Sequence, residues 1–187
     1  MPASFNTAMG MHETSFHIRA MRIGDLDAIL AIQAACYPPA MQEPAAVVLA
    51  RMGAAPETCV VAQDGGGVSA YLFAYPSRLG VVTALDTEFE VAVDADTLYL
   101  HDLSVAPRAV GRGLARRLVT QLLAQAEGCQ WSALVSVQDT AGFWTSLGFR
   151  PADVVDAEAR TALAGYPGSA RYMLRALTGP GAPSPNC

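Results

Sequence analysis

The chain has 187 residues, 52% of them hydrophobic, with 12 basic and 17 acidic side chains and a net charge of −5. This length suits one domain, and the apolar content excludes a globally disordered chain. The acidic balance argues against nucleic acid and anionic membranes as partners. Every basic residue is an arginine, so no lysine can act as a phosphate clamp, Schiff-base former or general base.

The first half of the chain predicts an N-terminal strand, two helices and a hairpin. Residues 1–15 are polar and aperiodic, and we expect a mobile tail there, followed by a single domain over residues 16–177. The expected elements are a strand at 16–21, a helix opened by Asp25 as its cap and broken at 37–39, a short helix at 44–52, and strands at 58–63 and 68–75 joined by a glycine-rich turn.

The second half predicts a long acidic connection and then alternating strands and helices. The connection covers 76–95; strands are expected at 97–105, 131–137 and 172–177, helices at 112–127 and 140–147, and a flexible tail at 178–187. The order is that of a mixed α+β fold, with an antiparallel first half and a β-α-β crossover in the second. Ligands favour the carboxyl ends of strands in such a crossover.

The cysteine pattern bears on the compartment. Four cysteines are widely spaced, with no Cys-x-x-Cys and no Cys/His cluster; they are Cys36, Cys59, Cys129 and Cys187. This pattern disfavours a disulfide scaffold and a structural zinc site. No segment reads as a secretory signal or a membrane span. We therefore expect a cytoplasmic protein without a metal.

The turn after the third long strand has the features of an anion site. Gly111 and Gly113 alternate in a turn that leads directly into an amphipathic helix. Glycines allow a sharp turn and a close approach of a ligand, and the first amides of a helix favour an anion. Arg108, Arg112 and Arg116 surround the same turn. The sequence therefore predicts a phosphate or diphosphate site, with an ordinary conformational turn as the alternative.

Two other phosphate-binding motifs are excluded. A nucleoside-triphosphate loop needs Gly-Lys-Ser/Thr, and this chain has no lysine. A dinucleotide fingerprint has a third glycine where Arg116 stands, and it usually opens an α/β domain rather than following residue 100.

Two motifs carry a resemblance to a known family. Residues 108–113 are similar to the Arg/Gln-x-x-Gly-x-Gly/Ala signature of the GNAT superfamily of N-acetyltransferases. Residues 139–149 resemble the second motif of that family, and residues 163–173 look like the closing strand of one bacterial branch. The resemblance covers about 160 residues. It implies a central mixed, mostly antiparallel sheet of six to seven strands, flanked by helices and splayed between the fourth and fifth strands.

The resemblance also implies acetyl-CoA as co-substrate and acetyl transfer to an amine. Backbone groups of the strand before the signature bind the pantetheine in the family, and the signature amides bind the diphosphate. Carried over to this chain, the cofactor-binding residues are Leu103, Ser104, Val105, Arg108, Val110, Gly111, Arg112, Gly113, Leu114, Ala115, Asp139 and Phe143.

Candidate catalytic residues lie on the strand that precedes the signature. His101 is the candidate base, because an imidazole ordinarily titrates near neutral pH. The family's usual tyrosine acid is replaced by Trp144, whose indole is not an acid. Tyr99, Ser136 or water is then the candidate acid, or the thiolate leaves unprotonated. Strand alternation would place Asp102 on the opposite face from His101, as a structural partner.

The acceptor side is interpreted from charge. Acidic residues at 88, 90, 94 and 96 and the Tyr-Pro-Pro segment at 37–39 are expected to rim the acceptor groove, which favours a cationic amine of a small molecule or peptide. Homodimers are common in the family, but no residue here specifies one. The alternative function is a catalytically degenerate acyl-CoA-binding or sensing module, motivated by Trp144.

Overall fold

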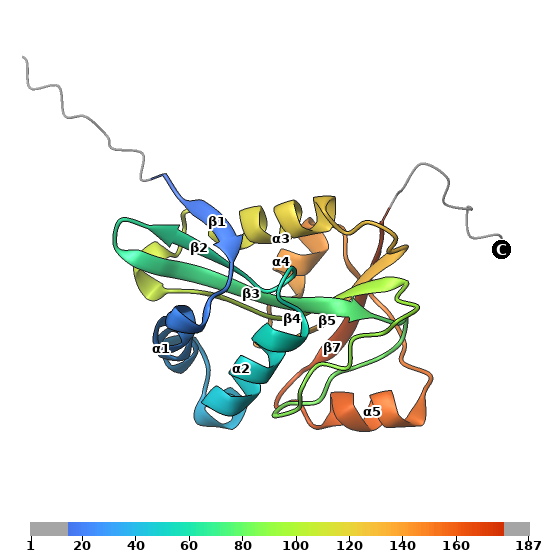
Figure 1. The fold of residues 1–187 in the computed structure, drawn as a ribbon. Coiled ribbons are helices and arrows are strands. Elements are labelled where there is room, and N and C mark those ends of the chain that lie inside the picture. The colour runs from blue at the N-terminus through green and yellow to red at the C-terminus, as the bar shows by residue number, and fades with distance from the viewer. Residues whose placement is uncertain (1–14, 178–187) are drawn as a thin grey trace, which may run out of the picture.

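The computed structural model of the protein describes residues 15–177 (Figure 1). The tails predicted at 1–15 and 178–187 lie outside these residues, apart from Ser15. None of the helices within 15–177 combines the length and the apolarity that a membrane span requires.

Within residues 15–177, seven strands form one sheet, and five α-helices flank it. The strands are β1 His17–Ala20, β2 Val60–Asp64, β3 Gly67–Ser77, β4 Thr97–Val105, β5 Trp131–Ser136, β6 Arg150–Pro151 and β7 Arg171–Ala176. The helices are α1 Leu26–Cys36, α2 Ala45–Ala54, α3 Leu114–Ala124, α4 Ala141–Ser146 and α5 Ala157–Ala164. The strand order is β1-β2-β3-β4-β5-β7-β6, and only the β4–β5 pair is parallel. The predicted mixed α+β architecture is therefore confirmed.

The helices cover both faces of the sheet (Figure 1). Helices α3 and α4 lie on one face, where Leu114, Leu118 and Leu122 of α3 pack against the sheet at helical spacing. Helices α1, α2 and α5 lie on the other face, over a core rich in tyrosine and phenylalanine. Each face of the central strands is thus buried, which fits the nearly continuous apolar sequence of β3.

Two predicted details are corrected. Asp25 is the N-cap residue of α1, as predicted, but its side chain makes no capping hydrogen bond: the carboxylate accepts a hydrogen bond from the Arg22 amide and pairs with Arg19. The segment before β7 contains β6 and α5, which the sequence did not predict. Strand β6 has two residues, and α5 buries only Ala159, so neither leaves a clear periodic signal.

Strands β4 and β5 pair only from their N-terminal ends. Thr97–Leu100 pairs with Trp131–Leu134, and beyond these residues no pairing continues, although β4 runs on to Val105. The backbone groups of β4 that would face β5 are therefore left without a strand partner. The predicted splay between the fourth and fifth strands is present.

A β-bulge interrupts β4 at the point where the two strands separate. Asp102 pairs with Phe73 and Leu100 pairs with Ala74, so His101 is an extra residue on β4. A bulge breaks the alternation of side chains along a strand. Asp102 bonds to Tyr71, and His101 packs edge-on against Phe89, two residues of the same aromatic core. The two side chains therefore share one face, contrary to the prediction from alternation.

Candidate active site

A cavity of about 430 Å³ occupies the gap between β4 and β5. Its walls come from β4, β5, the end of α1, the start of α3, and α4 with the turn before it. The lining residues are Cys36, Tyr37, Leu72, Leu100, His101, Asp102, Leu103, Ser104, Val105, Val110, Ala115, Val135, Val137, Gln138, Thr140, Phe143 and Trp144. Six of the twelve predicted cofactor residues are among them.

The turn into α3 has the backbone geometry that an anion site needs. Gly111 and Gly113 have φ angles of +83° and +74°, in the left-handed region that favours glycine. Gly113 is the N-cap of α3, and no side chain caps the helix. The amide of Arg117 donates to the carbonyl of Gly113, so the amides before it have no partner within the helix. These free amides stand beside Ala115, whose small side chain lines the cavity.

The arginines near this turn contact protein groups. Arg108 and Arg112 approach the Asp64 carboxylate at 3.5 and 3.6 Å, and Arg108 donates to the carbonyl of Val68 at 2.8 Å. Arg116 donates to Ser146 in α4. The guanidinium groups therefore tie the β2–β3 turn and α4 to the start of α3, and their predicted role toward a phosphate stays a prediction.

The two predicted residues around α4 differ in position. Phe143 lines the cavity, with its ring 5.0 Å from that of Trp144. Asp139 does not line it: this residue has a φ of +57°, and its carboxylate accepts a hydrogen bond from Ser169 at 3.0 Å. The neighbours of Asp139, Gln138 and Thr140, line the cavity instead.

A second cavity of about 30 Å³ adjoins the first. The residues that line both are Tyr37, His101, Asp102, Val135 and Val137. Four further residues line only the small cavity, namely Met41, Glu43, Leu85 and Tyr166. His101 and Asp102 therefore stand where the two cavities meet.

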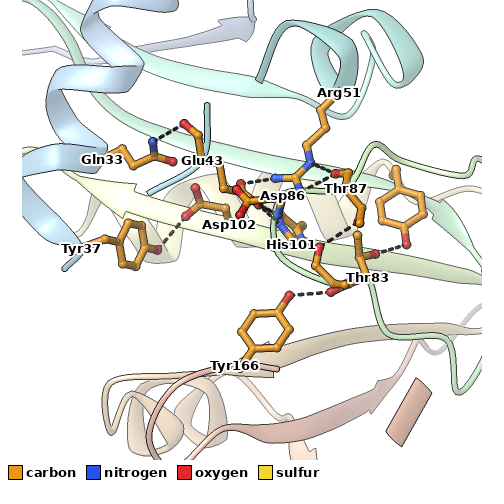
Figure 2. Close-up of polar contacts among 12 residues, drawn as sticks. Gln33, Tyr37, Glu43, Arg51, Thr83, Asp86, Thr87, His101, Asp102 and Tyr166 are labelled. Atoms are coloured by element: carbon orange, nitrogen blue, oxygen red, sulfur yellow. Dashed lines mark hydrogen bonds and ion pairs between the residues drawn. The ribbon is translucent and has the colours of Figure 1, made fainter. Parts of the chain in front are cut away.

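A buried chain of charged groups supports His101 (Figure 2). The His101 Nε2 atom lies 3.4 Å from the Glu43 carboxylate, which also forms an ion pair with Arg51. Arg51 donates two further hydrogen bonds to the carbonyl of Thr87. Burial alone would raise the pKa of Glu43, but the hydrogen bonds and charges of His101 and Arg51 outweigh it and lower the pKa to about 2.

Asp102 has a different environment. One carboxylate oxygen accepts a hydrogen bond from the Tyr37 hydroxyl at 2.6 Å and the other accepts from Tyr71 at 2.8 Å. Burial raises the pKa of Asp102, although these two hydroxyls act in the opposite direction. Burial and the adjacent carboxylate raise the pKa of Tyr37 well above its usual value.

Tyr99, the second predicted catalytic residue, is not at the junction. Its side chain is fully buried in the aromatic core beside Tyr75, and it lines neither cavity. Its hydroxyl has no hydrogen-bond partner among residues 15–177, and burial raises its pKa well above the ordinary value. The structure therefore gives Tyr99 no contact with a reacting group.

The acidic residues of the connection before β4 do not line the junction either, although Leu85 of the same connection lines the small cavity. Asp94 pairs with Arg78, and Asp96 accepts from the Leu79 amide and Thr97 at the opposite end of β4. Glu88 and Glu90 are exposed. The carboxylates at the cavities are Glu43 and Asp102, which sequence reasoning did not assign to the site. The sequence contains one signal for Glu43: its ion-pair partner Arg51 is the lone charged residue in the apolar sequence of α2.

Comparisons with known proteins agree with this geometry. The sequence model described as "Acetyltransferase (GNAT) family" matches residues 26–149. No curated protein sequence matches the chain significantly. Among solved structures, the chain is similar to the GphF GNAT-like decarboxylase in complex with isobutyryl-CoA, at 22% identity and a TM-score of 0.74, over 87% of this chain and 100% of that one.

Two further structures show the same fold. The loading GNATL domain of CurA from Lyngbya majuscula has 14% identity and a TM-score of 0.66, over 87% of this chain and 98% of that chain. The ribosomal-protein-S18-alanine N-acetyltransferase from Escherichia coli has 18% identity and a TM-score of 0.62, over 89% of this chain and 97% of that chain. Similarity at these identities establishes the fold that the chain shares with them.

Proposed function

Because the chain belongs to the acetyltransferase (GNAT) family, we propose that it is an acetyl-CoA-dependent N-acetyltransferase acting on a primary amine of a small molecule or peptide. The observation that carries this proposal is the position of His101 at the junction of the two cavities. A thioester in the large cavity and an amine in the small one would meet at this imidazole.

The cofactor side fits a coenzyme A thioester. The free amides at the start of α3 suit a diphosphate, because helix N-termini favour anions. Leu103–Val105 pairs with β3 but has no strand partner on its β5 side, and this open edge suits the amides of the pantetheine arm, since an extended chain can pair with an open strand. When bound, acetyl-CoA supplies an electrophilic carbonyl carbon and a thiolate leaving group.

His101 has the arrangement of a general base. The Glu43 carboxylate beside Nε2 stabilises the tautomer that carries its hydrogen on that nitrogen. The lone pair of Nδ1 is then free, and Nδ1 has no partner among residues 15–177. This atom accepts the proton of the acceptor's ammonium group, directly or through one water, so that a neutral amine attacks the thioester.

The leaving thiolate has no tyrosine at the family's usual position. Trp144 occupies that position and packs against Phe149, and its indole does not act as an acid. Tyr37 lines both cavities, but its pKa is raised, which makes it a weak acid. A thiol has an ordinary pKa of about 8.5, so the thiolate is stable enough to leave before it is protonated by water.

The lining of the cavities favours transfer over decarboxylation. A substrate that loses carbon dioxide carries a carboxylate, which binds best beside a cation. No arginine lines either cavity, whereas two carboxylates, Glu43 and Asp102, do. The proposed reaction therefore differs from the one named for the GphF GNAT-like decarboxylase, despite the shared fold.

Thiol release from acetyl-CoA, measured over a panel of primary amines, tests the proposal. We expect turnover with at least one class of amine, and mass spectrometry should find the acetylated product. Coenzyme A binding, measured separately by calorimetry, provides the control. Tight binding without turnover of any amine would contradict the proposal and favour an acyl-CoA-sensing module.

A further inference from the structure

Asp102 is a buried carboxylate without a cationic partner. It is absent from the ion pairs formed among residues 15–177, in which Arg51 pairs with Glu43 instead. Its protein partners are two neutral hydroxyls, those of Tyr37 and Tyr71. Removing a carboxylate from water without a counter-ion is costly, so this arrangement is favoured when a cation occupies the adjacent space.

The carboxylate retains capacity for such a cation. Each oxygen of an ionised carboxylate has two lone-pair positions, and each oxygen of Asp102 accepts one hydroxyl hydrogen bond. The two tyrosines therefore orient the group and leave one position on each oxygen. Asp102 lines both cavities, so these positions are next to the space that a ligand enters.

An independent observation at the same place points to a ligand. The His101 side chain is 2% exposed and lines both cavities, yet its Nδ1 has no partner among residues 15–177. Buried polar atoms in folded proteins are nearly always hydrogen-bonded. An unpaired nitrogen and a carboxylate without a cation thus stand on adjacent residues of one bulge, and an ammonium group satisfies both.

We propose that Asp102 is the counter-ion of the acceptor's ammonium group, and that the acceptor is a primary amine without a carboxylate on the adjacent carbon. This inference rests on the proposed function. Asp102 binds the cation, and His101 then removes one of its protons. The bulge makes this possible because it places both side chains on one face of β4.

The lack of a free cation defines the substrate class. An α-amino acid would bring its own carboxylate next to Glu43 and Asp102. No arginine lines either cavity, and Arg51 is fully occupied by Glu43 and the Thr87 carbonyl. The small cavity, of about 30 Å³, suits the amino group itself, since this is about the volume of one water molecule. Met41, Leu85 and Val137 line it with apolar surface.

Matched ligand pairs test the inference by binding to the coenzyme A-loaded protein. The pairs are 3-methylbutylamine with leucine and 2-phenylethylamine with phenylalanine, which differ only by a carboxylate; leucinamide retains the bulk without the charge. We expect the amines and leucinamide to bind and the amino acids to bind at least about 30-fold more weakly, because like charges would meet in a buried site.

Asp102→Asn, with Asp94→Asn as control, tests the assigned residue. We expect Asp102→Asn to weaken amine binding about 30-fold and leave coenzyme A affinity within about twofold, because a charge-assisted hydrogen bond is lost. The control removes a carboxylate that is paired with Arg78 at the surface, and it should change neither the amine affinity nor the coenzyme A affinity. In kinetics, Asp102→Asn should raise KM more than it lowers kcat.

Separate outcomes overturn the inference and the proposed function. Unchanged amine affinity in Asp102→Asn, absent amine binding to the wild-type protein, or amino acids binding as tightly as their amines would each overturn the ammonium site. The expected binding pattern without acetyl transfer would support the ammonium site and contradict the acetyltransferase.

Discussion

The two ends of the large cavity are built by different means. At the coenzyme end, one continuous segment, residues 103–115, provides main-chain amides and two glycines. At the acceptor end, side chains come together from the α1–α2 connection, α2, the loop before β4, the bulge and the segment after α5. One end is local in sequence, open and made of backbone, whereas the other is dispersed, buried and made of charges.

This difference predicts different responses to substitution. A main-chain site depends on conformation, so it tolerates most side-chain changes and fails where a glycine is required. A buried charge cluster depends on each member, because removing one partner leaves another charge uncompensated. Substitutions at the acceptor end should therefore affect catalysis and stability, and substitutions at the coenzyme end should affect cofactor affinity.

The largest effect is expected for His101→Gln. The variant removes the imidazole at the junction and keeps a polar side chain of similar length. We expect kcat to fall about a thousandfold, within the range for general bases, with coenzyme A affinity unchanged. Steady-state kinetics and calorimetry measure the two quantities.

His17→Gln is the matched control for this substitution, since His17 is exposed on β1. It should leave kcat and coenzyme A affinity at wild-type values. A kcat for His101→Gln within a few-fold of the wild type would remove this residue from the proposed mechanism.

Glu43→Gln should reduce stability in a pH-dependent way. The pKa of Glu43 falls from 4.5 to about 2 in the fold, so the ionised form stabilises the native state. By linkage this is worth on the order of 3 kcal/mol, fully present above pH 4.5 and lost as the pH falls toward 2. The variant should lose about this amount at pH 7, because Arg51 is left buried and unpaired, and the difference from wild type should shrink at pH 3.

Denaturant unfolding of both proteins at pH 7 and pH 3 measures this difference. Asp94→Asn, which breaks the exposed ion pair with Arg78, should leave the free energy of unfolding nearly unchanged at either pH, because solvent screens this pair. A Glu43→Gln variant as stable as the wild type at pH 7 would contradict the view that the acceptor end depends on each charge.

Gly113→Glu should weaken coenzyme A binding about a hundredfold, through loss of charge-assisted hydrogen bonds from the turn. The φ of +74° disfavours any side chain, and a carboxylate at the start of α3 repels a diphosphate. Gly24→Glu is the control: an added Cβ there has open space and no strained φ. Undiminished affinity in Gly113→Glu would support the alternative that the turn is only conformational.

The contrast between the coenzyme end and the acceptor end also explains which parts of the site could be predicted from the sequence. The bounds of β4 and the helix after the glycine turn follow from local patterns, namely an apolar run ended by Pro107 and a 3.6-residue period. The coenzyme end was therefore predictable in outline. Asp139 is the exception, because its position depends on a contact with Ser169 thirty residues later.

The acceptor end was not predictable, for two physical reasons. The bulge at His101 is defined by the register of β4 against β3, which the pattern of a single strand does not specify. Glu43 reaches His101 across 58 residues of sequence through tertiary packing alone. The acidic connection was the more conspicuous charge pattern, yet its residues are exposed or bond to the start of β4.

The smallest effect is expected for Asp64→Asn, at the edge of the coenzyme end. Asp64 accepts a hydrogen bond from the Gly66 amide and interacts with Arg108 and Arg112. The Gly66 amide and the charge of Arg108 lower the pKa of this carboxylate. Replacing the carboxylate removes a charge that repels a diphosphate and removes the anionic partner of Arg108 and Arg112, although Arg108 keeps its hydrogen bond to the Val68 carbonyl and Arg112 its stacking on Phe16. We expect coenzyme A affinity to rise about threefold at low salt, the scale of an exposed charge interaction, and the gain to vanish at high salt. Asp94→Asn changes the net charge equally and should give no gain. Weaker binding by Asp64→Asn would instead mean that the carboxylate holds the arginines in their binding positions. The arginine side chains would then bind the diphosphate together with the backbone amides at this end.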